Sequence, residues 1–412
     1  MNEKQCLLIA YHFPPFGETS SRRSGCMAKY LPYYGWDPVV LTNKWDESMG
    51  SYDPEIVSGI PSDLAIYKAG KNAPENDMLL NLQRRIYHVF NPHRQPKEFV
   101  DSAIALVPKI IKENRIRVIW ATFPPLCNLW LASYISQKEG IPWVADLRDI
   151  IMLPFYEGIG ATLMYPIRLR AFHNIIKKAS EVVAVSEGIS AIVKKQIKRN
   201  VLIVPNGYDP DIIRNEKIDA FPMFELIYTG GMEWGRSDSL KTLLDALQVM
   251  IEKKEIEKQK VAISFYGRIN TGLFLKYKRH PCFSIMRFNG QVPRKHALEK
   301  QRHALILLLI STPGTGMMTS KIFEYLVARR PIMAIPRDID HCERVIAETQ
   351  SGVSCSTVEE IRTQLLKWYK EWESTGNIQW NGSIEKIGKY SRKAQVSDYA
   401  KIMDIVLNAK QY

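Results

Sequence analysis

Cysteine is scarce in this sequence, and its spacing suggests neither a structural bridge nor a metal site. The six cysteines are scattered along 412 residues without a C-x-x-C pair, and the eight histidines show no spacing typical of metal ligands. This pattern is typical of reduced thiols in a cytoplasmic protein rather than of a disulfide framework. We therefore expect a cytoplasmic protein without a dedicated metal.

The sequence also lacks the long apolar runs and short motifs that mark several common classes. Its N-terminus begins a strand at once and shows no signal-peptide pattern. The uncharged run 118–137 is interrupted by Pro124 and Pro125, so we interpret it as a strand, a loop and a helix rather than a membrane span. No G-x-G-x-x-G follows the first strand, which disfavours NAD chemistry, and no zinc spacing or RNA-binding motif indicates a nucleic-acid partner.

Length and charge indicate a two-domain protein with anionic partners. A chain of 412 residues is too long for one ordinary hydrophobic core, so two domains of about 200 residues are expected. The net charge of +13 favours partners such as nucleotides or phospholipid head groups. A basic surface that serves solubility alone is the other interpretation.

Short apolar runs alternate with helical patterns in both halves of the chain, which predicts an α/β fold of two doubly wound parallel sheets. The expected strands are 5–11, 38–41, 118–121, 143–146, 182–185, 201–204, 225–228, 261–266, 284–288, 305–310 and 331–334. A helix is expected at 239–255. The turn residues PNGYDPD place the domain boundary within 206–219, and the polar segment 72–97 predicts a loop insertion or a mobile helix pair.

Two strand–helix connections carry residues suited to anions. The first, YHFPPFGETSSRRSG, supplies Gly17, several hydroxyls and a helix start with Arg22 and Arg23, which would form an anion cradle. The second, YTGGMEWGRSDSLKTLLDAL, places Gly230-Gly231 after a strand, and Arg236 and Lys241 bracket the start of a helix. Backbone N–H groups, a helix dipole and two cations suit a diphosphate, although an ordinary structural turn is the alternative.

Glu324 is the only acidic residue between Glu299 and Asp338. It is expected on the first turns of a helix beside a Gly/Pro/Thr loop, where burying it unpaired would be costly. Its partner is either Lys321, three residues earlier, or a ligand with hydroxyl groups, such as a ribose.

Six segments, in order along the chain from Tyr11 to Pro336, carry a family resemblance. They are YHFPPFGETSSRRSGCMAKYLPYYGWDPVVLT, WVADLRD, VVAVSEGI, VPNGYDP, YTGGMEWGR and SKIFEYLVARRPIMAI. Together they resemble the retaining GT-B nucleotide-sugar glycosyltransferases of glycosyltransferase family 4.

The resemblance implies two Rossmann-like domains that face a central cleft. The acceptor domain would span 1–208 and be completed by a C-terminal helix within 390–412, and the donor domain would span 209–389. The co-substrate would be a nucleoside diphosphate sugar, transferred with retention of configuration and without a metal or other cofactor.

The resemblance also assigns roles to single residues. Arg236, Lys241 and Asp149 are the catalytic candidates, with Asp149 as the base if one is needed. The donor-binding candidates are Gly17, Gly230, Gly231, Gly316, Met317, Lys321 and Glu324, the last holding the ribose. Glu18, Arg23 and Arg148 are expected on the acceptor or phosphate side.

Three positions depart from the family pattern. Gly316 stands where the family commonly has the first of two glutamates, and Gly231 occupies the usual arginine position. Arg148-Asp149 stands where a His-Asp pair often occurs, which questions any histidine contact with the donor sugar. Arg148 has a structural alternative, an ion pair with Asp146 or Asp149.

The acceptor is expected to be lipid-linked or a glycan, in surface polysaccharide or glycolipid assembly. The apolar segment 150–165 is followed by 168–199, which holds eight Lys and Arg against two Glu, so we expect peripheral docking on an anionic inner membrane face. An ordinary buried helix with a solvated basic neighbour remains the other interpretation. Two other functions stay open: a GT-B sugar-nucleotide epimerase and a catalytically silent GT-B scaffold subunit.

Overall fold

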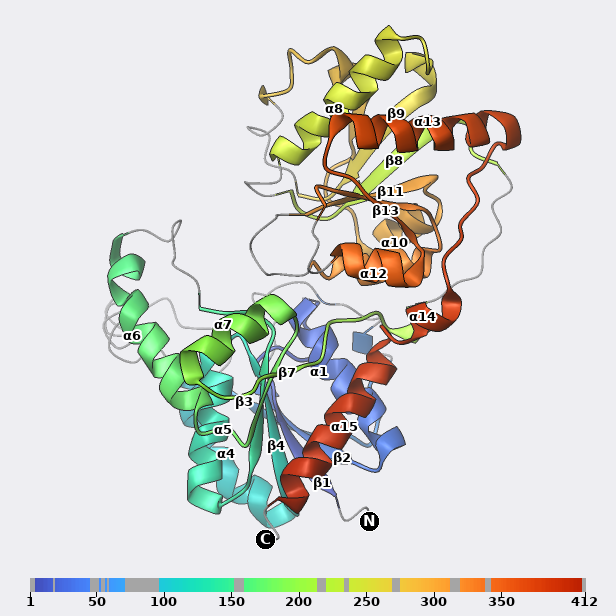
Figure 1. Cartoon of the computed structure of the whole chain (residues 1–412). Helices are drawn as coiled ribbons and strands as arrows, with labels where there is room; N and C mark the ends of the chain where they lie inside the picture. Colours follow the sequence, from blue (N-terminus) through green and yellow to red (C-terminus); the bar gives the residue numbers. More distant parts are fainter. Residues whose placement is uncertain are drawn as a thin grey trace. The chain divides into compact units, whose positions relative to one another are not determined.

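The computed structural model divides into two compact units, each built on its own parallel sheet (Figure 1). Unit 1 comprises residues 1–206 and 392–412, and unit 2 comprises residues 207–391. The structure describes residues 4–17, 19–44, 52, 56–57, 59–70, 96–151, 159–212, 220–232, 237–268, 275–311, 319–337 and 342–409. Most of the segment 72–97 therefore lies outside the described residues.

Unit 1 contains a seven-stranded sheet in the order β3-β2-β1-β4-β5-β6-β7. Its strands are β1 (Gln5–Ile9), β2 (Asp37–Asn43), β3 (Ala65–Ala69), β4 (Ile116–Phe123), β5 (Trp143–Leu147), β6 (Glu181–Ala184) and β7 (Leu202–Ile203). Its helices are α1 (Thr19–Tyr30), η1 (Leu31–Tyr34), α4 (Lys97–Glu113), α5 (Leu126–Glu139), α6 (Ile159–Ile176), α7 (Glu187–Ile197) and α15 (Arg392–Asn408).

Unit 2 contains a six-stranded sheet in the order β10-β9-β8-β11-β12-β13. Its strands are β8 (Phe224–Thr229), β9 (Val261–Tyr266), β10 (Met286–Phe288), β11 (Ile306–Ile310), β12 (Ile332–Ile335) and β13 (Gly352–Ser354). Its helices are η4 (Pro210–Ile212), α8 (Ser237–Glu252), η5 (Lys258–Lys260), η6 (Pro281–Ile285), α10 (Arg294–Arg302), α11 (Lys321–Ala328), α12 (Cys342–Thr349), α13 (Val358–Thr375) and α14 (Ile384–Gly388).

Both sheets are buried on both faces, which explains their nearly continuous apolar strands. In β1, Leu7 and Ile9 pack into one apolar cluster, whereas Cys6 and Leu8 pack into another on the opposite face. The second of these clusters includes residues of α15, which packs against α1 and β4 although it comes from the far end of the chain (Figure 1). All six cysteines are buried free thiols.

The expected α/β fold class is confirmed, and every expected strand is present with its ends shifted by no more than two residues. Two edge strands, β3 and β13, were not predicted. β13 is short and begins with Gly352, a residue that is rare in strands. The glycine is required there because a Cβ atom would overlap the carbonyl oxygen of Ile332 on β12.

Each sheet reverses its strand order at one place. In unit 1 this switch point lies between β1 and β4, and in unit 2 it lies between β8 and β11. In sheets of this order, ligands bind at the carboxyl ends of the strands beside the switch point. The two loops that follow β8 and β11 are therefore the first place to look for a site in unit 2.

Candidate functional site

Lys321 and the Gly230–Gly231 loop meet at the switch point of unit 2. Lys321 is the first residue of α11, after β11, and Gly231 follows β8. The Lys321 Nζ donates hydrogen bonds to Tyr228 Oη at 2.8 Å and to the Gly231 carbonyl oxygen at 3.4 Å. An ammonium group has three donors, and within the described part of the chain the third Lys321 donor has no partner. A cation is thus held beside the loop after β8.

Gly230 permits this approach of Lys321. Its φ of +103° lies in the left-handed region, and a Cβ atom at this position would overlap Lys321 Cε. The Gly230 N–H donates to the Tyr266 carbonyl oxygen at 2.6 Å. The sequence predicted that backbone N–H groups of this loop hold a phosphate. The N–H of Gly230 already donates to a backbone carbonyl oxygen, so it is not available for a phosphate.

Glu324 lies three residues after Lys321 on α11 and is held by α10. Arg294 donates from one terminal nitrogen to Glu324 Oε1 at 3.2 Å, and Gln301 Nε2 lies 3.4 Å from Glu324 Oε2. The buried Gln301 also donates to Thr229 Oγ1 at 2.9 Å, which ties the carboxylate to the end of β8. With side-chain exposures of 27% for Glu324 and 22% for Arg294, the pair remains accessible to solvent.

The sequence proposed Lys321 or a ligand as the partner of Glu324, and it missed Arg294 and Gln301. Both residues belong to α10, 30 and 23 positions away from Glu324. No spacing rule links them to Glu324, because their contacts depend on how α10 packs beside α11.

Lys241 is directed along its own helix. It lies in α8, and its Nζ is 2.6 Å from Asp245 Oδ2, one turn later. Asp245 Oδ1 is also 3.2 Å from His280 Nε2. The contacts of Lys241 therefore do not link it to Lys321 or the Gly230–Gly231 loop within the described residues.

Four of the predicted site residues, Glu18, Arg236, Gly316 and Met317, lie outside the described residues. Gly17 is described; it lies two residues before Thr19, the first residue of α1, and next to Phe16, whose backbone forms a bridge with Tyr52.

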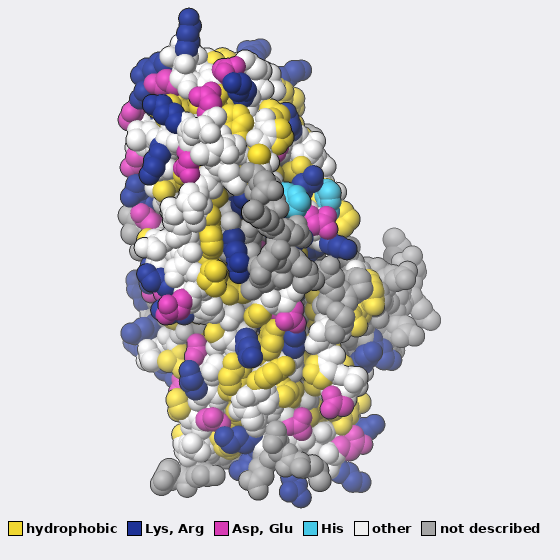
Figure 2. All heavy atoms as spheres, turned by 90° about the vertical axis from the view of Figure 1, so that its right-hand side faces the viewer, with side chains coloured by type: hydrophobic (Ala, Val, Ile, Leu, Met, Phe, Trp, Pro, Cys, Tyr) yellow, Lys and Arg dark blue, Asp and Glu magenta, His cyan; other side chains and the backbone are white. Residues whose placement is uncertain are grey.

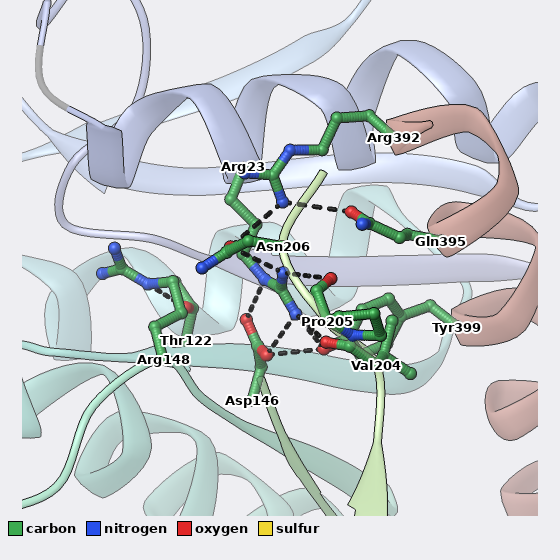
Figure 3. Close-up of polar contacts among 10 residues, drawn as sticks. All are labelled: Arg23, Thr122, Asp146, Arg148, Val204, Pro205, Asn206, Arg392, Gln395 and Tyr399. Atoms are coloured by element: carbon green, nitrogen blue, oxygen red, sulfur yellow. Dashed lines mark hydrogen bonds and ion pairs between the residues drawn. The ribbon is translucent and has the colours of Figure 1, made fainter. Parts of the chain in front are cut away.

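Arg23, predicted on the acceptor or phosphate side, is instead part of a buried structural cluster in unit 1 (Figure 3). Its side chain is 2% exposed and that of Asp146 is 0% exposed. Arg23 Nε and one terminal nitrogen donate to the two Asp146 oxygens, both at 2.9 Å. The remaining donors bind Tyr399 Oη, Asn206 Oδ1 and the carbonyl oxygens of Val204 and Pro205. A guanidinium that is fully used inside the fold cannot also bind a phosphate, so this prediction was wrong.

The cluster joins both ends of unit 1. Tyr399 on α15 donates to Asp146 Oδ1 at 2.5 Å, and Arg392, at the start of α15, donates to Asn206 Oδ1 at 3.3 Å. Burial and the Asp146 charge raise the pKa of Tyr399. For Arg23, burial alone would lower the pKa, but Asp146 and Tyr399 raise it overall. Arg23 is therefore charged throughout the physiological range.

Arg148 does not form the predicted ion pair with Asp146 or Asp149. Its Nε donates to Thr122 Oγ1 at 2.8 Å and a terminal nitrogen donates to the Pro124 carbonyl oxygen at 2.6 Å. The physical reason is that Arg23 already binds both oxygens of Asp146. Asp149 Oδ1 accepts from the Ile150 N–H at 2.8 Å, and burial raises the pKa of this carboxyl group.

The described residues contain no group of three or more His, Cys, Asp or Glu arranged to hold a metal ion. In the same residues, no helix combines the length and the apolar character that crossing a membrane requires.

Comparisons with known proteins show similarity in structure but not in sequence. No protein-family model matches the chain, and no curated protein matches it in sequence. The fold is similar to Alr3699/HepE from Anabaena in complex with UDP, with 14% identity and a TM-score of 0.62 over 97% of this chain and 99% of that one. The same Anabaena protein also has a solved complex with UDP-glucose.

Two further structures show the same similarity. Sucrose-phosphate synthase from Thermosynechococcus elongatus is 13% identical, with a TM-score of 0.62 over 98% of this chain and 100% of that one. The lipopolysaccharide outer core galactosyltransferase WaaB in its apo form is 11% identical, with a TM-score of 0.55 over 96% of this chain and 99% of that one. At these identities the similarity establishes the fold: the chain consists of the two parallel-sheet, Rossmann-like domains of the GT-B type.

Proposed function

We propose that this protein is a retaining, metal-independent glycosyltransferase of the family 4 type, which moves a sugar from a nucleoside diphosphate sugar to an acceptor hydroxyl. One observation carries the proposal: Lys321 meets Gly231 at the switch point of unit 2, with Glu324 three residues further along the same helix. A cation for a diphosphate and a carboxylate for a ribose thus lie on one face of α11. The UDP complex of the Anabaena protein with the same fold supports a nucleotide ligand.

Lys321 is the cation that we assign to the donor diphosphate. It begins α11, so the partial positive charge of the helix N-terminus adds to its own. Negative charge grows on the diphosphate as its bond to the sugar breaks, and a fixed cation therefore stabilises the transition state more than the ground state. We assign Arg236 and Lys241 to the same diphosphate from the sequence.

Glu324 is the residue that we assign to the donor ribose. A carboxylate accepts up to about four hydrogen bonds, so the bonds from Arg294 and Gln301 orient the group without excluding a ribose. Its two oxygens can accept from two adjacent hydroxyls. Arg294 and Gln301 then act as positioning residues for this contact.

The reaction requires no dedicated base. The bond between the anomeric carbon and the diphosphate oxygen breaks, and the acceptor oxygen bonds to the same face of the sugar. The acceptor proton passes to the leaving phosphate oxygen. Asp149 is the alternative base, and its raised pKa would help it to accept a proton near neutral pH.

We assign the donor to unit 2 and the acceptor to unit 1, with a lipid-linked or glycan acceptor in surface polysaccharide or glycolipid assembly. The membrane part of this proposal is supported by Lys177, Lys178, Lys194, Lys195 and Lys198, which are exposed at the ends of α6 and α7. No ion pair neutralises them within the described residues. On the face drawn in Figure 2, by contrast, basic and acidic side chains are interspersed.

Calorimetry with UDP, GDP and their common sugars tests the proposal. We expect binding of one nucleoside diphosphate, transfer of its sugar with retained configuration by NMR, and full activity in EDTA. If no nucleotide binds, the scaffold function replaces the proposal, and a changed sugar without transfer favours the epimerase. A product of inverted configuration overturns only the retaining mechanism, and loss of activity in EDTA overturns only the metal independence.

A further inference from the structure

Arg148 is a half-buried cation at the carboxyl edge of the unit 1 sheet, directly after β5. Its described partners are the neutral oxygens of Thr122 and Pro124 on β4 and the loop that follows it. Arg148 forms no ion pair within the described residues. Figure 3 shows its guanidinium pointing away from the Arg23–Asp146 pair.

The interior next to Arg148 carries an excess of positive charge. Three arginines lie in or beside the cluster around Arg23: Arg23 itself, Arg148 and Arg392. Among them, Asp146 forms an ion pair with Arg23. Arg392 is bound by the neutral amides of Asn206 and Gln395. Burial lowers the pKa of Arg148 and of Arg392 to about 10, so both remain charged at neutral pH. Even if Asp149 is counted, three cations are set against two carboxylates, and such an imbalance favours binding of an anion.

His12 adds a second unused polar group at the same edge. It follows β1, stacks on Phe16 with ring centroids 4.8 Å apart, and packs edge-on against Tyr11. Ser24 Oγ donates to the His12 carbonyl oxygen at 2.8 Å, which fixes the backbone. Neither ring nitrogen has a hydrogen-bond partner within the described residues, and Nδ1 is buried. Burial and the charge of Arg148 lower the pKa of His12 to about 4, so the ring is neutral and offers one N–H donor.

We propose that Arg148 and His12 form a binding site for an oxyanion carried by a substrate. Arg148 supplies charge and a planar fork of donors that matches a carboxylate or a phosphate, and His12 supplies one N–H. Two sources share this chemistry on the acceptor, which we assign to unit 1: the carboxylate of a uronic acid and a phosphate. The inference rests on the proposed function and names the substrate group that unit 1 binds.

Binding to the full chain tests the site in two arms. In the carboxylate arm, calorimetry compares methyl glucuronide with methyl glucoside on the unmodified protein, on Arg148→Gln and on the control Arg115→Gln, which removes an exposed arginine directly before β4. In the phosphate arm, thermal shifts with inorganic phosphate are recorded for the same proteins in a chloride buffer.

A carboxylate predicts that methyl glucuronide binds about tenfold or more tightly than methyl glucoside, as expected for a charge-assisted hydrogen bond. This advantage should vanish in Arg148→Gln and persist in Arg115→Gln. An acceptor phosphate predicts that inorganic phosphate stabilises the unmodified protein but not Arg148→Gln. His12→Phe, which preserves the ring stack, should reduce either effect a few-fold.

Binding of UDP itself distinguishes failure of the oxyanion site from failure of the glycosyltransferase proposal, and it shows that the variants are folded. It should be equal in the unmodified protein and in Arg148→Gln. If UDP binds to both but neither the carboxylate nor phosphate distinguishes them, the oxyanion site is overturned and the glycosyltransferase proposal stands. If UDP does not bind the unmodified protein, the glycosyltransferase proposal fails. If UDP binds the unmodified protein but not Arg148→Gln, Arg148 acts on the nucleotide or on the fold, and the oxyanion site is contradicted.

Discussion

Glu324 on α11 and Arg294 on α10 form an ion pair, with a terminal nitrogen of Arg294 3.2 Å from Glu324 Oε1, although the two residues are 30 positions apart in the chain. The pair fixes the carboxylate that we assign to the donor ribose. Because both side chains are partly exposed, the pair itself contributes little to stability. Its expected effect is on binding.

Glu324→Ala should weaken donor binding because the ribose loses an acceptor for two hydroxyls. A charge-assisted hydrogen bond contributes roughly 1.5–3 kcal/mol, so about a tenfold or greater rise in the dissociation constant is expected. Calorimetry with the nucleoside diphosphate measures it, with Glu385→Ala, an exposed glutamate on α14, as the control. Unchanged affinity in a folded Glu324→Ala protein would reduce the carboxylate to a structural partner of Arg294.

Gly230→Ala should both destabilise unit 2 and displace Lys321. The left-handed φ of +103° costs an L-residue about 1–2 kcal/mol, and the new Cβ atom would overlap Lys321 Cε. We expect a lower melting temperature and weaker donor binding. Gly388→Ala is the matched control, since its Cβ atom would meet no atom within 4 Å. Equal behaviour of the two variants would show that Lys321 does not depend on this glycine.

Arg23→Met should be strongly destabilising because it leaves the Asp146 carboxylate buried without its cation. Removing one partner of a buried pair typically costs about 3–5 kcal/mol. Urea unfolding measures the loss, and the double variant Arg23→Met with Asp146→Leu should recover part of it. A single variant as stable as the unmodified protein would contradict the structural role of Arg23 and return it to the list of ligand-binding candidates.

The burial of His12 should make stability depend on pH below neutrality. Its folded pKa of about 4 is lower than the ordinary value of 6.5, so between these two values the unfolded state binds more protons than the folded state. The contribution of His12 is therefore most favourable above pH 6.5 and becomes less favourable as the pH decreases towards 4, with a slope of up to about 1.4 kcal/mol per pH unit from this group.

Comparison with His12→Phe isolates the contribution of this histidine. The difference in unfolding free energy between the two proteins should be constant above pH 6.5 and should shift in favour of the variant between pH 6.5 and 4. Parallel curves over this interval would show that His12 titrates with an ordinary pKa.

The lysines at the ends of α6 and α7 should bind the chain to anionic vesicles but not to neutral ones. Each basic residue near an anionic surface contributes about 1 kcal/mol, so Lys177→Ala with Lys178→Ala should weaken binding about thirtyfold. Sedimentation at low and high salt measures it. The pair Lys367→Ala and Lys370→Ala, which removes two exposed lysines of α13, should have no effect. Equal recovery in the supernatant with both lipid types would end the membrane proposal.

The residues of the cluster around Arg23 show where sequence reasoning reached its limit. Arg23 follows the first strand and lies on the first turns of a helix, and the same local pattern occurs in anion-binding loops. Its true partners come from β5, from residues 204–206 and from α15, up to 376 positions away. A local pattern cannot distinguish a phosphate ligand from a carboxylate that arrives from a distant part of the chain.

The sequence by itself determined the two parallel sheets, because apolar runs buried on both faces and separated by helical patterns permit few other arrangements. It also determined that Gly230, Lys321 and Glu324 lie at the ends of strands or the start of a helix, since these positions follow from local spacing. Only the tertiary structure decided which charged group meets which: Asp146 binds Arg23 and not Arg148, and Glu324 binds Arg294. The physical reason is that the free energy of a charge in the interior depends on all groups packed around it, and those groups come from elements that only the folded chain brings together.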